Sequence, residues 1–346
     1  MKLGFIGLGA MGLSHLKAFA ELSGPAEISA VCARNRDHIS KALAIAPRAQ
    51  GIHDEKTLLK SAVDAVVIAT PNFTHVPLAL QALESDKHVF LEKPCGITEK
   101  ECDALLCASA QSDRVVIIGH ELRYSPYFRR IHEFIQAGRV GVPRMVWTRE
   151  FRGPFQKKSE DWIEDVRRSG GTLVDKNCHH FDLMNWWAGS HPARVAAFGG
   201  CAVNRVRADE HQGLDHATVS WEYENGVRGT LQLCMFARDF PAEDLEMGVV
   251  GDAGMLQTKI PNLEIHEWRR GTKQTEPIIH KVDALLGQGW GGHLGFAEIH
   301  QAFIEAIVSG RKPLTAPAEC VDGTLLAIAA EESIRTGAVT KIGARR

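Results

Sequence analysis

The chain has 346 residues, of which 45% are hydrophobic and 24% are charged, and its formal net charge is −2. This composition excludes a disordered chain, and the near-neutral charge excludes the basic surface that nucleic-acid-binding proteins carry. The length is too great for one ordinary core and predicts two domains.

The first third of the chain alternates short apolar runs with helical patterns. Strands are expected at residues 2–6, 27–33, 65–69, 88–91 and 115–119, and helices at 11–22, 37–46, 76–85 and 99–112. Strand–helix alternation with short connections is typical of a parallel sheet that is covered by helices on both faces. We therefore expect a doubly wound α/β domain over residues 1–121.

The pattern changes after residue 121. Helices are expected at 126–136, 171–187, 294–308 and 317–336, and strands at 145–151, 195–203, 217–223, 227–235, 245–250, 255–260 and 263–268. Turn residues such as Asn225-Gly226 separate several of these strands, which indicates antiparallel hairpins. Residues 122–346 are therefore expected to form an α+β domain with a predominantly antiparallel open sheet.

A glycine-rich loop, GLGAMG at residues 7–12, connects the first predicted strand to the first predicted helix. In this pattern the first glycine permits a tight turn, the second lets the backbone approach a pyrophosphate, and the third lets the helix pack closely on the strand. The N–H groups at the helix start would then meet the phosphates. The context predicts a Rossmann fold that binds a dinucleotide, with a purely structural turn as the alternative. The expected cofactor contacts are Gly7, Gly9, Ala10, Met11 and Gly12.

The end of the second predicted strand bears on the choice between NAD and NADP. A carboxylate that would hold the ribose 2′-hydroxyl is expected there, but the chain has Cys32-Ala33-Arg34-Asn35-Arg36. Arg34 could pair with a 2′-phosphate, because guanidinium matches phosphate geometry. This slightly favours NADP. The alternative, in which Arg34 is an exposed arginine and NAD is held by other contacts, weighs nearly as much.

Three further groups of polar residues stand out. The run TPNFTH at 70–75 follows one predicted strand and Glu92-Lys93-Pro94 follows the next, at the strand ends where such sheets bind ligands. Asp175 and His179 are four residues apart in a predicted helix, which places them on one face. No metal is expected at this helix, because neighbouring Cys178 and His180 point to another face and no familiar ligand spacing is present.

These segments resemble the Gfo/Idh/MocA family of oxidoreductases, which includes glucose–fructose oxidoreductase and inositol dehydrogenase. The resemblance covers nearly the whole chain. It rests on the order of the glycine loop, ATPNFTHVPLALQAL, KHVFLEKP, GGTLVDKNCHHFDLMNWW and the C-terminal FIEAIVSGRKPLTAPAECVDGTLLAIAAEESIRTG. It implies an enzyme that transfers a hydride between NAD or NADP and a secondary hydroxyl of a small carbohydrate, namely a sugar, polyol or inositol.

The resemblance also implies residue roles. Lys93, Asp175 and His179 match the catalytic residues, and the peptide before Pro94 is often cis in the family. Thr70, Asn72, His75, Glu92, Lys93 and Trp162 match residues on the cofactor side. The family often has glycine two residues after the aspartate, where this chain has Asn177, and a second histidine, His180, follows the catalytic one. A histidine suits a general base near neutral pH, and a lysine can stabilise a developing alkoxide.

Substrate contacts are expected from Arg123, Tyr124, Asn177, His180 and His293, although packing is an equal alternative for Arg123 and Tyr124. A redox-neutral, NAD-dependent glycosidase, which oxidises a sugar transiently, eliminates the aglycone and restores the hydroxyl, is the alternative function. Relatives commonly pair through an exposed sheet face, so a homodimer or homotetramer is expected. Neither nucleic acid nor membrane is expected as a partner.

The compartment is judged from the cysteines and from the start of the chain. The eight cysteines form no C-x-x-C pair, which is typical of reduced thiols in a chain of this length. Residues 2–6 already form a predicted strand, so a signal peptide is not expected, and no apolar run reaches the length of a membrane span. We expect a cytoplasmic protein.

Overall fold

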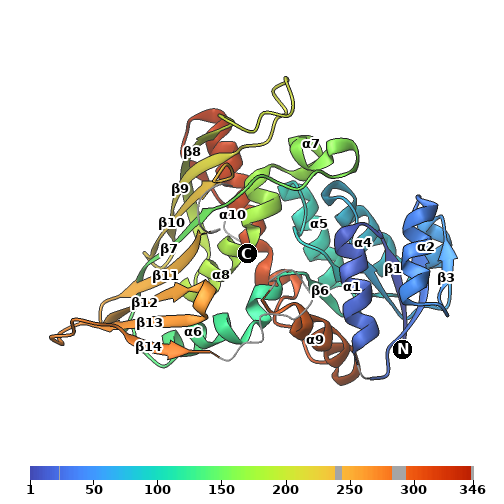
Figure 1. Ribbon diagram of the computed structural model, residues 1–346, viewed down its shortest axis with the longest axis horizontal. Helices are drawn as coiled ribbons and strands as arrows, with labels where there is room; N and C mark the ends of the chain where they lie inside the picture. The colour runs from blue at the N-terminus through green and yellow to red at the C-terminus, as the bar shows by residue number, and fades with distance from the viewer. Residues whose placement is uncertain (23, 238–243, 283–293, 344–346) are drawn as a thin grey trace. The chain divides into compact units, whose positions relative to one another are not determined.

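The computed structural model describes residues 1–22, 24–237, 244–282 and 294–343, which form two compact units (Figure 1). The first unit contains residues 1–124 and 294–321. The second contains residues 125–282, apart from the gap at 238–243, and residues 322–343. The boundary expected after residue 121 lies close to the end of the first segment, whereas residues 294–321, expected in the second domain, belong to the first unit.

The first unit is built on a parallel sheet with the strand order β3-β2-β1-β4-β5-β6. Its strands are β1 (Lys2–Ile6), β2 (Glu27–Cys32), β3 (Gln50–Ile52), β4 (Ala65–Ile68), β5 (His88–Leu91) and β6 (Val116–Ile118). Its helices are α1 (Ala10–Glu21), α2 (Arg36–Ile45), α3 (Glu55–Leu59), α4 (His75–Glu84), α5 (Glu99–Ala110) and α9 (Phe296–Ser309). The strand order reverses between β1 and β4, and such a switch point is where open α/β sheets bind ligands.

The core of the first unit explains why α9 belongs to it. All four residues of β4 are fully buried, as expected for a central strand covered on both faces. Ile299, Phe303 and Ile304 of α9 join the same apolar cluster as Phe5 and Phe90 of the sheet. The apolar stripe of α9 therefore finds its core in the sheet that the first 124 residues build.

The second unit contains a sheet with the strand order β14-β13-β12-β11-β7-β10-β9-β8-β15. Its strands are β7 (Pro143–Phe151), β8 (Pro192–Gly200), β9 (His216–Tyr223), β10 (Arg228–Cys234), β11 (Asp244–Gly251), β12 (Gly254–Lys259), β13 (Glu264–Arg269), β14 (Ile278–Lys281) and β15 (Thr340–Lys341). The paired strands run antiparallel except β7 and β10, which are parallel. The expected α+β fold with a predominantly antiparallel sheet is confirmed.

Helices α6 (Pro126–Gln136), α7 (Val166–Ser169) and α8 (Cys178–Ala188) belong to the second unit, and α10 (Pro317–Thr336) passes from the first unit into it. Helix α8 packs on the sheet, where Phe181 meets Trp221 edge-to-face with ring centroids 5.2 Å apart. No helix among the described residues is long and apolar enough to span a bilayer.

The structure differs from the expected elements in several places. The short strands β3, β14 and β15 and the five-residue helix α3 were not expected, because each is too short to show a periodic apolar pattern. The helix expected over residues 171–187 begins instead as a π-helical turn at Leu173–Asn177, and α8 starts only at Cys178. This turn carries Asp175.

Candidate active site

The glycine loop has the geometry that a pyrophosphate requires. Gly7 has a φ of +92°, and a Cβ on it would lie 2.5 Å from the Ala69 carbonyl oxygen. A Cβ on Gly12 would lie 1.9 Å from the Gly7 carbonyl oxygen, so α1 can start this close to β1 only with glycine. A Cβ on Gly9, by contrast, would meet nothing within 4 Å. Gly9 is also the N-cap of α1 and no side chain caps the helix, so its first N–H groups suit an anion.

This contrast gives a matched pair of variants. Gly9→Ala is expected to leave the melting temperature unchanged but to weaken cofactor binding about tenfold or more, because the new methyl occupies the space in which the pyrophosphate approaches. Gly12→Ala is expected to lower both the melting temperature and the cofactor affinity, since its methyl collides with the Gly7 carbonyl oxygen. Thermal unfolding and cofactor titration measure the two effects. Unchanged cofactor affinity in Gly9→Ala would contradict this assignment.

His75 holds the loops after β4 and β5 together. Its side chain is buried, and its Nε2 lies 2.9 Å from the Thr70 carbonyl oxygen and its Nδ1 3.3 Å from that of Pro94. Burial lowers the pKa of His75, so the ring is neutral and donates to one of the two carbonyls at a time. Both ring nitrogens face backbone, which differs from the expected direct contact with the cofactor. We assign His75 the positioning of Thr70 and of the segment that contains Lys93.

Glu92 belongs to a buried series of hydrogen-bonded side chains inside the first unit. Its carboxylate lies 2.7 Å from Nε2 of His15, whose Nδ1 lies 2.7 Å from Nε2 of His300. Nδ1 of His300 contacts the Phe296 carbonyl oxygen. Burial raises the pKa of Glu92, but the hydrogen bond and charge of His15 and the charge of Lys93 outweigh it and hold this pKa below its ordinary value.

His300 ends this series of hydrogen-bonded side chains. Burial together with the charge of His15 lowers the pKa of His300 well below its ordinary value, so the His300 ring is neutral. Because Nδ1 of His300 faces the Phe296 carbonyl oxygen, its Nε2 can accept a hydrogen bond from Nδ1 of His15. The sequence predicts a cofactor-side position for Glu92, but the pairing with His15 and His300 was not anticipated.

Lys93 directly follows Glu92 in the sequence. It is partly exposed between the buried residues Glu92 and Pro94, and the peptide bond between Lys93 and Pro94 is cis, as expected. Asn72, also expected on the cofactor side, is buried, while Thr70 accepts a hydrogen bond of 2.7 Å from the Thr74 hydroxyl. The first unit thus gathers the expected cofactor-side residues of two neighbouring strand ends and leaves Lys93 accessible.

Asp175 and His179 lie in the second unit, on the π-helical turn and in the first turn of α8. Asp175 is buried and His179 is partly exposed. The turn starts beside Glu331 of α10, whose carboxylate accepts a hydrogen bond of 2.8 Å from the Leu173 N–H. Desolvation of this carboxyl raises the pKa of Glu331 to about 7 although the residue is partly exposed. A Cβ on Gly171, whose φ is +108°, would lie 2.4 Å from the same carboxylate.

Glu150, at the end of β7, is the residue that sequence reasoning missed. Its carboxylate lies 3.0 Å from Nζ of Lys176 and 3.6 Å from Nη1 of Arg152, and it accepts a hydrogen bond of 3.1 Å from the Asn177 amide. Nδ1 of His180 lies 3.5 Å away. Although burial opposes ionisation, the charges of Lys176, His180 and Arg152 lower the pKa of Glu150 to about 2.

The side chains of Asn177 and His180 are buried beside Glu150. Asn177 is 0% and His180 3% exposed, and the Asn177 amide nitrogen lies 3.0 Å from Nδ1 of His180. This differs from the expected substrate contacts, because two side chains so deeply buried against Glu150 expose very little surface. A signal was available: Glu150 occupies the same alternating phase of its strand as the buried residues Val146 and Thr148.

The other expected substrate residues, and Trp162 from the cofactor side, have varied surroundings. Arg123 is buried and donates a hydrogen bond of 2.9 Å to the Glu319 carbonyl, which favours the packing alternative. Trp162 lies in the second unit, in the 3-10 helix Ser159–Glu164, and is partly exposed. His293 lies outside the described residues.

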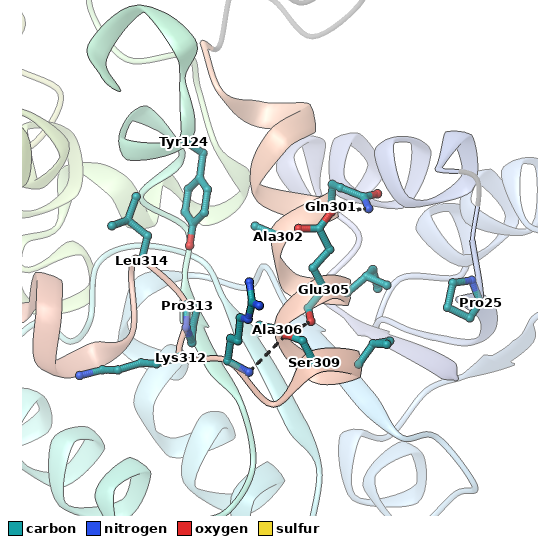
Figure 2. A pocket seen from close by; sticks show the side chains of 13 residues that line it. Pro25, Tyr124, Gln301, Ala302, Glu305, Ala306, Ser309, Lys312, Pro313 and Leu314 are labelled. Atoms are coloured by element: carbon teal, nitrogen blue, oxygen red, sulfur yellow. Dashed lines mark hydrogen bonds between the residues drawn. The ribbon is translucent and has the colours of Figure 1, made fainter. Parts of the chain in front are cut away.

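Tyr124 borders a hollow of about 580 Å³ in the first unit, formed by α9 and the segment at 311–314. Figure 2 shows its phenol beside Pro313 and Leu314, and its hydroxyl lies 3.3 Å from the Thr315 nitrogen. No residue of the glycine loop lines this hollow, so it is distinct from the expected dinucleotide site. The burial of Tyr124 in this segment also favours packing over a substrate contact.

A six-stranded parallel sheet, its switch point and an uncapped glycine loop together define a dinucleotide-binding protein with a second α+β domain. A family model described as "Oxidoreductase family, NAD-binding Rossmann fold" matches residues 1–120, and one described as "Oxidoreductase family, C-terminal alpha/beta domain" matches residues 132–342. The chain belongs to the Gfo/Idh/MocA family of oxidoreductases.

Several known proteins are similar to this chain. The scyllo-inositol 2-dehydrogenase (NAD(+)) of Bacillus subtilis strain 168 is 22% identical over 347 residues, which cover 99% of this chain and 96% of that protein. The putative oxidoreductase YteT of the same strain is 35% identical over 138 residues, but the match covers only 39% of this chain and 32% of that relative. A levoglucosan dehydrogenase solved in complex with NADH is 18% identical, with a TM-score of 0.86 and 99% of both chains covered. That likeness shows the fold.

Proposed function

We propose that the protein is a dehydrogenase that transfers a hydride between NAD or NADP and a secondary hydroxyl of a sugar, polyol or inositol. The observation that carries this proposal is the open, uncapped loop at Gly9, combined with an accessible Lys93 that follows the buried Glu92–His15 hydrogen bond. The inositol dehydrogenase named above supports the substrate class.

In this proposal the nicotinamide supplies the hydride acceptor when it is bound. The chain must bind the cofactor, accept the hydroxyl proton and stabilise the charge left on oxygen. Gly9 and the start of α1 hold the pyrophosphate, His179 takes the proton as general base, and Lys93 donates a hydrogen bond to the developing alkoxide. Asp175, one turn before His179, orients the imidazole or binds a neighbouring hydroxyl.

The proposal is tested by following the absorbance of reduced nicotinamide while the purified protein is offered inositols, hexoses, polyols and anhydrosugars with NAD and with NADP. Turnover with at least one secondary alcohol is expected. Aryl glycosides belong in the same panel, because aglycone release without reduced cofactor would instead support the redox-neutral glycosidase. If neither signal appears and the protein captures no pyridine nucleotide, the proposal fails.

Arg34 is the residue that we propose to favour NADP. It is exposed just after β2, where the 2′-phosphate is expected. Two carboxylates, Asp54 and Glu55, also lie near this end of β2. Burial, and then the negative charges of Glu55 and Asp54, raise the pKa of Cys32 to about 12. Phosphate at this position would therefore gain from Arg34 and lose from Asp54 and Glu55, so only a modest preference for NADP is expected.

Arg34→Ala is expected to weaken NADP binding about tenfold, because a charge-assisted bond to phosphate is lost, while NAD binding stays unchanged. Titration of both cofactors by fluorescence measures the two affinities, and Arg36→Ala, also exposed, is the matched control. Equal losses for NAD and NADP, or no loss for either, would count against a role for Arg34 in cofactor choice.

We further propose that the protein forms a homodimer or homotetramer through the open face of the second unit's sheet. Val146, Thr148 and Glu150 of β7 are buried, whereas Met145 and Phe151 point to the opposite face and are exposed. Phe198 of β8 is 79% exposed. Exposed aromatic and aliphatic side chains on one sheet face are typical of protein–protein contact surfaces.

A further inference from the structure

Two thiols and an imidazole converge inside the first unit, away from the glycine loop in the sequence. Cys95 follows Pro94 after β5, His120 follows β6, and Cys320 lies in the first turn of α10. All three residues are buried. One ligand atom of each, the sulfur of either cysteine and a ring nitrogen of His120, lies within 4.8 Å of the other two.

Two backbone hydrogen bonds hold the three segments together. The Gly119 N–H donates to the Leu91 carbonyl at 2.7 Å, which ties the segment of His120 to the end of β5. The Ile118 N–H donates to the Thr315 carbonyl at 2.9 Å, which ties β6 to the segment that leads into α10. The three ligands are therefore held by neighbouring, hydrogen-bonded segments, and the close approach of their side chains is built into the fold.

The charges of this cluster match a divalent, thiophilic cation. Thiolates and imidazole are the ligands that zinc prefers, with bond lengths of about 2.3 Å to sulfur and about 2.0 Å to nitrogen, so a bound ion needs only small movements of the side chains. Two thiolates and one neutral imidazole around a 2+ ion give no net charge, which avoids the cost of burying an unpaired charge. The Cys320 thiol donates a hydrogen bond to the Ala316 carbonyl oxygen at 3.3 Å, and its proton is released when the thiolate binds the ion.

We propose that Cys95, His120 and Cys320 form a binding site for zinc or a similar thiophilic divalent cation. Three protein ligands leave the fourth tetrahedral position to a small ligand such as water. The bound ion links the segment just after Lys93 and Pro94 to β6 and to α10. Its expected effect is to rigidify this segment, and the proposal does not depend on which substrate the enzyme oxidises.

Cobalt titration of the full-length protein, stripped with a chelator and kept reduced, tests the site. Thiolate-to-cobalt charge-transfer absorption in the near ultraviolet is expected to rise to one equivalent per chain and to vanish when zinc displaces cobalt. Cys320→Ala, Cys95→Ser and His120→Gln are each expected to weaken zinc binding by about 100-fold or more, since loss of a ligand exceeds the effect of losing an outer partner. Cys107→Ala, which removes an exposed thiol of α5, is the matched control and is expected to bind normally.

A second readout keeps the test valid if one variant folds poorly. Zinc is expected to raise the melting temperature of the wild type and of Cys107→Ala, because it binds the folded state, and to leave folded Cys320→Ala unchanged. Circular dichroism identifies the variants that remain folded. Absence of the charge-transfer band in the wild type, or a band of equal strength in Cys320→Ala, would overturn the proposal.

Discussion

Lys93→Met and His179→Gln are each expected to lower kcat by about 10²–10⁴-fold, the range that positioned acid–base and electrostatic catalysis supplies. Lys93→Met keeps the aliphatic stem but removes the ammonium that would stabilise the alkoxide. His179→Gln removes the base while it keeps a polar side chain in the first turn of α8. Cofactor affinity is expected to change little in either variant, because the pyrophosphate is held by the glycine loop.

The pH profile separates the two roles. In the wild type, kcat/KM in the oxidative direction is expected to fall on the acidic side as the base becomes protonated, and this limb should be absent in His179→Gln. Lys100→Met and His53→Gln, which alter exposed residues, serve as controls for the loss of a lysine and a histidine. Near-normal turnover in Lys93→Met or His179→Gln would refute the proposed catalytic assignment.

Removal of the Glu150 carboxylate is expected to have the largest effect on stability. Glu150→Ala removes the carboxylate that pairs with Lys176 and Arg152. It also removes the hydrogen-bond acceptor of the Asn177 amide. Breaking a buried ion pair from one side costs about 3–5 kcal/mol of unfolding free energy. Because these residues hold the turn that carries Asp175, kcat is expected to fall as well. Urea denaturation and turnover of the folded fraction measure the two effects.

The pH dependence of stability gives an independent check on Glu150. Its pKa in the folded protein is about 2, below the ordinary value of 4.5, so its contribution is present above pH 4.5 and is lost as the pH falls towards 2. The wild type is therefore expected to lose more stability across this range than Glu150→Gln. Glu222→Ala, which removes a partly exposed surface partner of Arg194 and Arg228, should change stability little. A variant Glu150→Ala as stable as the wild type would contradict the role of this cluster.

The dinucleotide-binding half was readable from the sequence because its signals are local. Apolar runs specify β1 and β4, and Gly12 meets its steric limit at Gly7, within the same loop. In α6, which belongs to the second unit, and in α10, which passes into it, proline at the first helical position marks the start of the helix. The boundaries predicted for these two helices, Pro126–Gln136 and Pro317–Thr336, are those observed. The order of the motifs also indicated the family.

Only the tertiary structure decided which polar residues meet, because each meeting joins distant parts of the chain. From the sequence, Asn177 and His180 were expected to contact a substrate, but in the structure both are buried beside the carboxylate of Glu150 in β7. The sequence placed Glu92 near a cofactor, but did not reveal the hydrogen bond from His15 of α1 that lowers its pKa, or His300 of α9 next to His15. The sequence determines the chemistry of each side chain. Long-range packing determines its burial and its partners, and these decide its charge and its role.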